Sequence, residues 1–363
     1  MSTKLKLLGL TICVTLPFVV NADVFGAGNL EIGKEWWASQ VKAVYSSAEA
    51  QAKIFSGAKK QYEAQKEWLE KAAKGGDGQA GWYLAKLFYR EKDNEGAKHW
   101  LKLSASRGFL KSFAELGTIF EGEGNIAQAR KWFKQGAKNG NLSCQYKLAV
   151  LLEREAEIEE AKKWYLSAAQ DNYVPAQLGL SVLLYKEGKH EEGKKWGTKA
   201  ANQGNPQVQY GFGALLHSVG NLDYAKYWYL KAAEQNDKVS QYVLGSIFDK
   251  EGNVEEAKRW YEKAANQGYI NAQNNLAALF EIQGDIKQAR KWYLKGAVLG
   301  HKIAQYNLGV LLLNHEKNRD EVKAWFQASA NQNYPIAQSR LGAMLYEEDN
   351  LNEARKWWLK ALH

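Results

Sequence analysis

The hydrophobic positions of this chain repeat with a period of 32 residues, which tryptophan marks most clearly. Tryptophan recurs at that interval from residue 68 to residue 292, and two further copies stand at residues 325 and 357. Small and large apolar residues alternate around each copy at helical spacing, as in Ala289, Trp292, Tyr293 and Ala297. A fixed period of this size indicates one helical unit copied along the chain. The tryptophans are therefore predicted to pack in the core, and not to form a sugar-binding platform.

Each tryptophan is predicted to lie in a helix, here called helix B, that ends about two turns later. Only glycine or asparagine stands eight residues after the tryptophan, as at Gly108, Asn172 and Gly268. These two residues adopt left-handed backbone angles at low steric cost, which is typical of a helix C-cap. This column therefore predicts where every helix B stops.

A second helix, here called helix A, is predicted before each helix B. Its apolar anchor stands sixteen residues before the tryptophan and is followed by a small residue, as in Leu84-Ala85 and Leu276-Ala277. A small residue lets two packed helices approach closely. The expected unit is a helical hairpin with tight contact beside the anchor.

The motifs of these helices resemble the SEL-one-like repeat family, a branch of the tetratricopeptide superfamily. The resemblance is carried by Ala-x-x-Trp-Tyr-x-Lys-x-Ala at 289–297 and Ala-Gln-Tyr-x-Leu-Gly at 304–309. It implies an all-α fold, a right-handed superhelical solenoid of antiparallel helix pairs. About nine repeats are expected over residues 77–363, and residues 23–76 are expected to form a degenerate helical cap.

The first 22 residues are predicted to be a signal peptide. Lys4 and Lys6 precede a short apolar stretch at 7–20, and Ala22 offers a small residue for cleavage before Asp23. The apolar stretch is short for a membrane span, so a retained anchor is the weaker alternative. We therefore predict an exported protein, most simply a periplasmic one in a bacterium.

The net charge indicates the type of partner, and the cysteine content indicates whether the exported chain can form a disulfide. A net charge of +9 suits an anionic partner, but export argues against nucleic acid as that partner. Cys13 lies in the predicted signal peptide, so the exported chain would keep one thiol, Cys144, and no intrachain disulfide.

No catalytic, cofactor or metal site is expected from the sequence. The histidines occupy unrelated positions of the repeat and lack the spacing of metal ligands. The stretch Gly76–Gly81 matches a dinucleotide fingerprint in letters only, because it follows a helix instead of a strand. We therefore predict that the protein is not an enzyme.

The first candidate site is the side of helix A opposite its anchor, which lines the concave groove in tetratricopeptide-like folds. Aromatic residues recur there two positions before the anchor and five positions after it. Such side chains give a large contact area at low entropic cost and favour binding, although a packing role is the alternative. The candidate groove residues are Trp82, Tyr89, Tyr146, Tyr185, Tyr210, Tyr242, Tyr306 and Tyr346.

The second candidate is a basic stripe formed by the cation two residues before each tryptophan. Packed helices lie about 8–10 Å apart, so these cations would line up and attract an acidic protein or an anionic envelope component. The alternative is structural, because an acid often stands three residues earlier and can pair with the cation on the helix surface. The stripe residues are Lys98, Arg130, Lys162, Lys194, Lys226, Lys258 and Arg290.

The leading functional hypothesis is an exported, non-enzymatic scaffold that binds a protein partner in its concave groove. The resemblance supplies an alternative, since some bacterial members of the family are periplasmic immunity proteins that neutralise a secreted antibacterial lipase. A cell-envelope enzyme is the third alternative, for which the residues offer no acid–base pair or nucleophile. The identity of the partner and the oligomeric state stay open.

Overall fold

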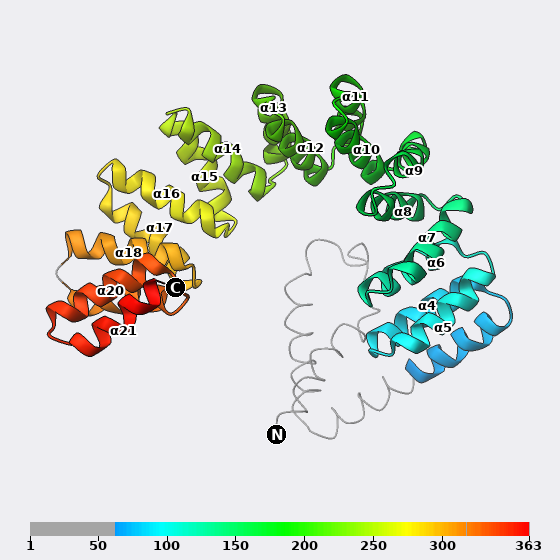
Figure 1. Ribbon diagram of the computed structural model, residues 1–363, viewed down its shortest axis with the longest axis horizontal. Helices are drawn as coiled ribbons and strands as arrows, with labels where there is room; N and C mark the ends of the chain where they lie inside the picture. The colour runs from blue at the N-terminus through cyan, green and yellow to red at the C-terminus, as the bar shows by residue number, and fades with distance from the viewer. Residues whose placement is uncertain (1–61, 317, 363) are drawn as a thin grey trace, which may run out of the picture. The chain divides into compact units, whose positions relative to one another are not determined.

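The computed structural model of the chain describes residues 62–316 and 318–362. All regular structure in these ranges is α-helical and is organised as successive helical hairpins (Figure 1). The predicted all-α repeat solenoid is thereby confirmed. The predicted signal peptide and residues 23–61 of the predicted cap lie outside the described residues.

Each hairpin joins an even-numbered helix A to the odd-numbered helix B that follows it, and a helix over residues 62–74 precedes the first hairpin. The A helices are α4 (Gly78–Arg90), α6 (Leu110–Gly122), α8 (Leu142–Arg154), α10 (Val174–Lys186), α12 (Pro206–Ser218), α14 (Lys238–Lys250), α16 (Ile270–Ile282), α18 (Lys302–His315) and α20 (Pro335–Glu347). The B helices are α5 (Asn94–Ser106), α7 (Ile126–Lys138), α9 (Ile158–Gln170), α11 (His190–Ala201), α13 (Leu222–Glu234), α15 (Val254–Asn266), α17 (Ile286–Val298), α19 (Arg319–Ala330) and α21 (Leu351–Ala361).

The chain divides into two compact units, one up to Leu151 and one from Leu152 onward. In the second unit, α10 contacts α12 and α14 contacts α16, whereas consecutive B helices are in weaker contact with each other. A helical array curves toward the side on which its helices lie closest together. The A helices therefore form the inner face within the second unit, and this surface is called the A face below.

The predicted ends of the B helices are confirmed by the backbone. Every described residue eight positions after a tryptophan of the 32-residue column has a positive φ, from 55° at Asn333 to 109° at Gly76. At the end of α15, Gly268 and Tyr269 each donate a backbone N–H to the last turn of the helix at 3.0 Å. These bonds satisfy carbonyl groups that the helix end would otherwise leave without partners.

Only half of the tryptophans in the column are buried, and in most hairpins the residue after the tryptophan lies deeper. Trp260 and four other tryptophans are buried, but four are half-buried and Trp68 is 63% exposed. The next residue is almost fully buried in most hairpins, as at Phe133, Tyr261 and Phe326. The prediction that every tryptophan packs in the core is therefore only partly correct.

The small residue after each anchor makes room for this deeper ring. A Cβ atom added to Gly245 would lie 2.5 Å from the ring of Tyr261, and one added to Gly309 would lie 2.7 Å from the ring of Phe326. Each ring thus packs directly on the backbone of helix A. The close approach of the two helices beside the anchor is confirmed.

Buried glutamines tie three successive helices together. Gln241 of α14 donates its Nε2 to the carbonyl oxygen of Ala233 in α13 at 3.1 Å. Its Oε1 accepts a hydrogen bond of 2.7 Å from Gln267 at the end of α15. Both ends of the buried amide are therefore satisfied, as burial of a polar group requires. The same two bonds recur at Gln177, Gln209 and Gln305.

Candidate functional site

Three of the candidate groove tyrosines are half-buried on the A face of the second unit. The ring of Tyr242 lies 5.8 Å from that of Tyr261, and the ring of Tyr306 lies 5.6 Å from that of Phe326. Tyr210 packs in the same way on its own helix B. Tyr242 also contacts the ring of Tyr269, and Tyr306 that of Tyr334, but each of the three tyrosines keeps part of its surface open to solvent.

The candidates of the first unit have different environments. Trp82 of α4 donates its Nε1–H to Glu115 of α6 at 2.8 Å, and Lys86 pairs with the same carboxylate at 2.7 Å. Tyr146 is half-buried in α8, and Tyr89 is exposed near the end of α4.

The last two candidates lie apart from the tyrosines described above. Tyr185 is 7% exposed, and its ring packs 5.3 Å from His190, so this side chain belongs to the core. Tyr346 is exposed near the end of α20, where its ring lies 5.7 Å from Trp358. The half-buried tyrosines Tyr210, Tyr242 and Tyr306 are therefore the candidates that share the A face.

The structure adds an asparagine cluster, formed by Asn274, Asn275 and Asn307, that the sequence analysis missed. Asn274 of α16 occupies the helix A position at which Tyr242 and Tyr306 stand in the adjacent hairpins. Asn307 donates its Nδ2 to Asn274 at 2.9 Å, and Asn274 donates to Asn275 at 3.3 Å. The cluster thus joins α16 to α18. Its signal in the sequence is this interruption of the tyrosine column.

Phenol groups of the B helices reach the A face beside the asparagine cluster. Asn275 donates its Nδ2 to the hydroxyl oxygen of Tyr261 at 3.2 Å. The hydroxyl of Tyr293 donates to Glu281 at 2.9 Å. Burial and the Glu281 carboxylate raise the pKa of Tyr293, so this phenol stays neutral at physiological pH. The face therefore presents amides and neutral phenols, together with the Glu281 carboxylate, between aromatic rings.

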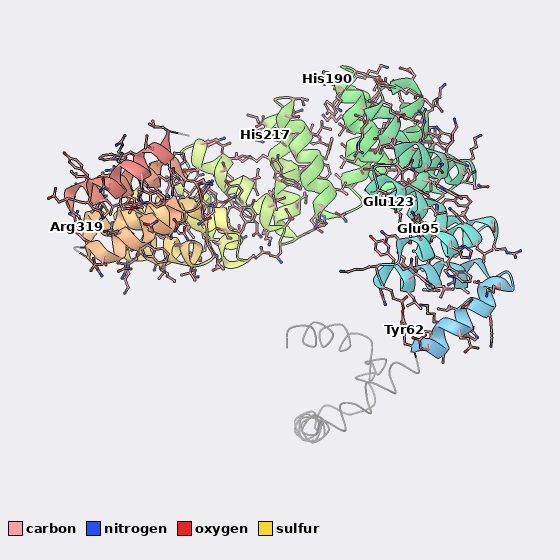
Figure 2. The ribbon with its side chains drawn as sticks, turned by 60° about the horizontal axis from the view of Figure 1, so that its bottom comes forward. Tyr62, Glu95, Glu123, His190, His217 and Arg319 are labelled. Carbon is pink, nitrogen blue, oxygen red and sulfur yellow. The ribbon has the colours of Figure 1, made fainter. Side chains whose placement is uncertain are left out.

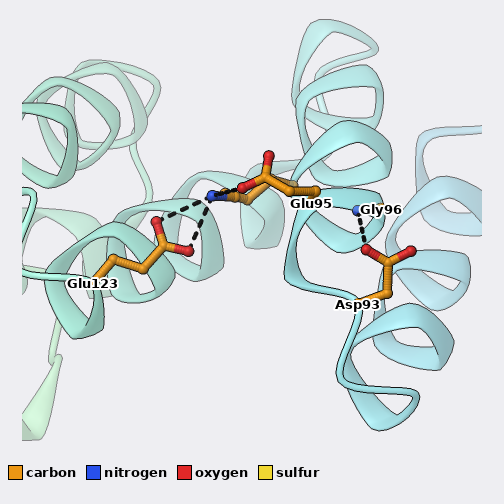
Figure 3. A network of polar contacts seen from close by, with 5 residues as sticks. Asp93, Glu95, Gly96 and Glu123 are labelled. Carbon is orange, nitrogen blue, oxygen red and sulfur yellow. Dashed lines mark hydrogen bonds and ion pairs between the residues drawn. The ribbon is translucent and has the colours of Figure 1, made fainter.

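The cations of the basic stripe bridge successive hairpins. Figure 2 places Glu95 of α5 and Glu123, the residue after α6, near each other in the first unit. Figure 3 shows both carboxylates directed at one nitrogen, that of Lys98, at 2.5 Å and 3.0 Å. Lys226 forms the equivalent bridge to Glu251 at 2.6 Å. The pair three residues apart was predicted from the sequence, but the partner 25 residues further along the chain was not.

The other stripe residues are also engaged within the fold. Arg130 is half-buried and has an interaction partner. Lys194 faces the ring of Tyr224 at 4.7 Å, because Val219 stands where the bridging acid stands elsewhere. The remaining bridges join Lys162 to Glu187, Lys258 to Glu255 and Gln283, and Arg290 to Glu316 and Glu321.

A fall in pH is expected to weaken these ion pairs, and a variant of Glu187 can test this prediction. Hydrogen bonds from Lys162 and then Lys189 hold the pKa of Glu187 below its usual 4.5. This carboxylate therefore stabilises the fold above about pH 4.5, and its contribution is lost as the pH falls through the folded pKa. The stability advantage of the natural chain over Glu187→Gln, measured by urea unfolding between pH 7 and pH 3, should shrink at low pH. An advantage that is constant across this range would contradict the prediction, and Glu262→Gln on exposed α15 surface serves as the control.

The described ranges also limit what other chemistry can be assigned. They contain no group of three or more histidine, cysteine, aspartate or glutamate side chains arranged to hold a metal ion. None of the helices in the described part is both long enough and apolar enough to cross a membrane.

Comparison with a protein-family model identifies the repeat. The Sel1 repeat matches ten segments, and the first begins within the predicted cap. The matched segments are residues 57–77, 81–109, 114–141, 142–173, 174–205, 209–237, 240–269, 270–301, 302–334 and 335–362. No curated protein sequence matches the chain.

Solved structures with this architecture include two Sel1-type proteins. One is c5321, a protective antigen of uropathogenic Escherichia coli with an SLR fold, at 29% identity and a TM-score of 0.51 over 82% of this chain and 71% of that one. A Sel1 repeat protein from Oxalobacter formigenes is 26% identical, with a TM-score of 0.53 over 73% of this chain and 85% of that one. Yeast Tom70, 16% identical over 79% of this chain and 61% of that one, shares the fold with a TM-score of 0.50. Because the repeat matches extend over most of its length, this chain belongs to the Sel1 repeat family.

Proposed function

We propose that this protein is an exported, non-enzymatic scaffold that binds an extended segment of a protein partner along the A face of its second unit. Repeat proteins of the Sel1 and tetratricopeptide type generally mediate protein–protein interactions and are typically not catalytic. The observation that carries the proposal is the asparagine cluster between Tyr242 and Tyr306. Export rests on the predicted cleavage before Asp23, which lies outside the described residues.

The asparagine cluster has the chemistry that an extended peptide requires. A primary amide offers two N–H donors and one carbonyl acceptor, the same groups that a peptide backbone exposes. Asn275 and Asn307 are half-buried, so each can bond a ligand while packing fixes its position. Tyr242 and Tyr306 flank these amides with partly open rings on which side chains of the partner can pack. Amides would thus hold the backbone of the partner, and the rings would select its side chains.

Replacing both Asn275 and Asn307 with alanine is expected to weaken partner binding about tenfold or more, because two hydrogen bonds of about 0.5–1.5 kcal/mol each are lost. The partner is first captured by a photo-crosslinking amino acid at position 242 of the mature protein in its native envelope. Its affinity for each variant is then measured by titration calorimetry. Unchanged affinity in the double variant would contradict the proposal, as would equally efficient crosslinking from Tyr227, which is exposed on helix B.

Two controls separate this site from general destabilisation and from the basic stripe. Asn314→Ala changes an exposed asparagine of the same helix α18 outside the cluster and should leave the affinity unchanged. Tyr210→Ala and Tyr242→Ala should weaken binding while the helix content, measured by circular dichroism, stays the same. Binding that survives these changes but disappears with added salt would place the partner on the basic stripe instead.

A further inference from the structure

The glutamine ties between hairpins are incomplete at α16 and α17. Gln273 donates its Nε2 to Ala265 at 3.1 Å, as the equivalent glutamines do, but its buried Oε1 has no hydrogen-bond partner within the described residues. The missing donor is explained by Leu299, which stands where other hairpins carry a donating glutamine. Those donors are Gln203, Gln235, Gln267 and Gln332. An unsatisfied buried acceptor destabilises the fold unless something else supplies the donor.

An open hollow lies beside α17 next to Gln273, although the unpaired oxygen itself is closed to solvent. Gln273 is 4% exposed and lines this hollow of about 770 Å³, a size within the range of ligand sites. The oxygen lies near Gly296, where an added Cβ atom would lie 3.8 Å from Gln273 Oε1 and 3.0 Å from the Cβ atom of Ala304 in α18. The other side chains around the hollow are Lys287, Arg290, Lys291, Leu294, Lys295, Val298 and Leu299.

A lysine row, formed by Lys287, Lys291 and Lys295, runs along the hollow. The three residues are four positions apart, so they lie on one side of α17 over about 12 Å. All three are exposed, and no ion pair within the described ranges involves any of them. Helix α17 contains no acidic residue, whereas the equivalent helix α15 contains three. The row therefore presents positive charge that the fold itself does not neutralise.

Exposed apolar side chains lie beside the lysine row. Leu294 and Val298 follow Lys287, Lys291 and Lys295 on the same helical face, and Val298 is 70% exposed. With Leu299 they form the apolar part of the hollow. Positive charges and apolar groups next to each other on one helical face are complementary to an amphipathic helix that carries acidic side chains beside its apolar ones.

We propose that this hollow binds an acidic amphipathic helix of a protein partner, at a site separate from the A face. Carboxylates at four-residue intervals pair with the lysine row, and apolar residues cover Leu294, Val298 and Leu299. A side-chain amide of the bound helix donates the hydrogen bond that Gln273 Oε1 lacks. The bound helix thus supplies the amide N–H donor that Gln267 supplies to Gln241 in the preceding hairpin.

A membrane surface fits these observations less well. Segments that bind anionic lipid surfaces carry clusters of about four to eight cations, and the lysine row has three. The acceptor oxygen of Gln273 is closed to solvent and needs a donor that projects into the lining of the hollow. A side chain on a helix meets that requirement, whereas a flat layer of headgroups does not.

The test uses the full chain and a synthetic helical peptide of about 18 residues. The peptide carries three glutamates four positions apart, leucines on the adjoining side and one glutamine directed at Gln273. Binding is measured by fluorescence anisotropy. Leu299→Gln should raise the melting temperature, because its amide can donate to Gln273, and should lower the peptide affinity at least about tenfold. Because this change adds no charge, it does not act through general electrostatic attraction.

Matched variants complete the test. Gln267→Leu in α15 removes the same kind of donor and should lower the melting temperature without creating a second peptide site, because α15 is acidic. Lys287→Gln combined with Lys291→Gln and Lys295→Gln should abolish binding, whereas Lys263→Gln in α15 should not affect it. Asn275→Ala with Asn307→Ala should bind the peptide normally, so failure of this proposal is distinguishable from failure of the A-face proposal.

Three results would overturn the proposal. The first is equal peptide affinity in the natural chain and in Leu299→Gln. The second is equally tight binding of a scrambled peptide of the same composition, which would reveal only charge attraction. The third is binding to phosphatidylglycerol vesicles without binding to the peptide, which would assign the lysine row to a lipid surface.

Discussion

Replacement of Phe212 by alanine is expected to lower the free energy of unfolding by about 3–5 kcal/mol. Phe212 is fully buried and stands where most hairpins have a leucine anchor. Its ring fills the space beside Gly197, which replaces the aromatic residue that follows tryptophan in most other hairpins. The ring also lies 5.8 Å from that of Trp228. Its removal therefore leaves a cavity that no neighbouring side chain is placed to fill.

The control for this prediction is the coupling between Gly197 and Phe212. Gly197→Ala alone should cost about 1–3 kcal/mol, because its Cβ would overlap the phenyl ring. Phe212→Leu restores the usual anchor and makes room for that atom, so the double variant should be more stable than the sum of the single effects predicts. Urea unfolding followed by circular dichroism measures each free energy. Additive effects, within about 0.5 kcal/mol, would show that the two positions do not share one space.

Cys144 is expected to react with a thiol reagent at least about a thousandfold more slowly in the folded protein than in a free peptide at pH 8. Burial raises the pKa of its thiol from 9.0 to about 12, so the reactive thiolate is scarce. The side chain is also closed off from solvent, since its sulfur packs against Gly136. Cys13→Ser removes the only other thiol, and the reaction is followed by absorbance with a disulfide reagent.

An exposed cysteine in the same unit serves as a control for a thiol that the reagent can reach freely. Lys138→Cys, combined with Cys144→Ala and Cys13→Ser, places a cysteine at an exposed position near the end of α7. This variant should react at the rate of a free peptide. In urea, Cys144 should reach the same rate once the chain unfolds. Fast reaction of Cys144 in the folded state would mean that α7 and α8 separate far more often than their packing implies.

The features that were predicted correctly depend on short stretches of chain. The glycine or asparagine eight residues after each tryptophan identifies the helix end because few other residues accept a positive φ, as at Gly268 and Asn172. The small residue beside the anchor indicates close helix packing because a larger side chain there would meet a ring, as at Gly245. Each of these features depends on the residue type at one position and on a short stretch of chain around it.

The candidate site was predicted less completely, since a column of like residues does not reveal how deeply each member is buried. Tyr185 follows the groove pattern but packs into the core, because Gly193 in the facing helix leaves space for its ring. The asparagine cluster lies on the predicted face, but the hydrogen bond that joins its two helices links Asn307 to Asn274, 33 positions apart. Contacts of that range depend on how one hairpin stacks on the next.

By itself the sequence determined the repeat, the ends of the B helices and the side of helix A that faces away from its anchor. Each follows from periodicity and from the backbone preferences of single residues. Only the tertiary structure decided that in most hairpins the residue after tryptophan is more deeply buried than tryptophan. The two residues are neighbours on one helix, and the position of the helix packed against them determines which one is buried more deeply. It likewise decided that the cations bridge to acids 25 residues away and that Leu299 leaves Gln273 without a donor. Those outcomes arise from side chains of different hairpins that meet only when the hairpins stack.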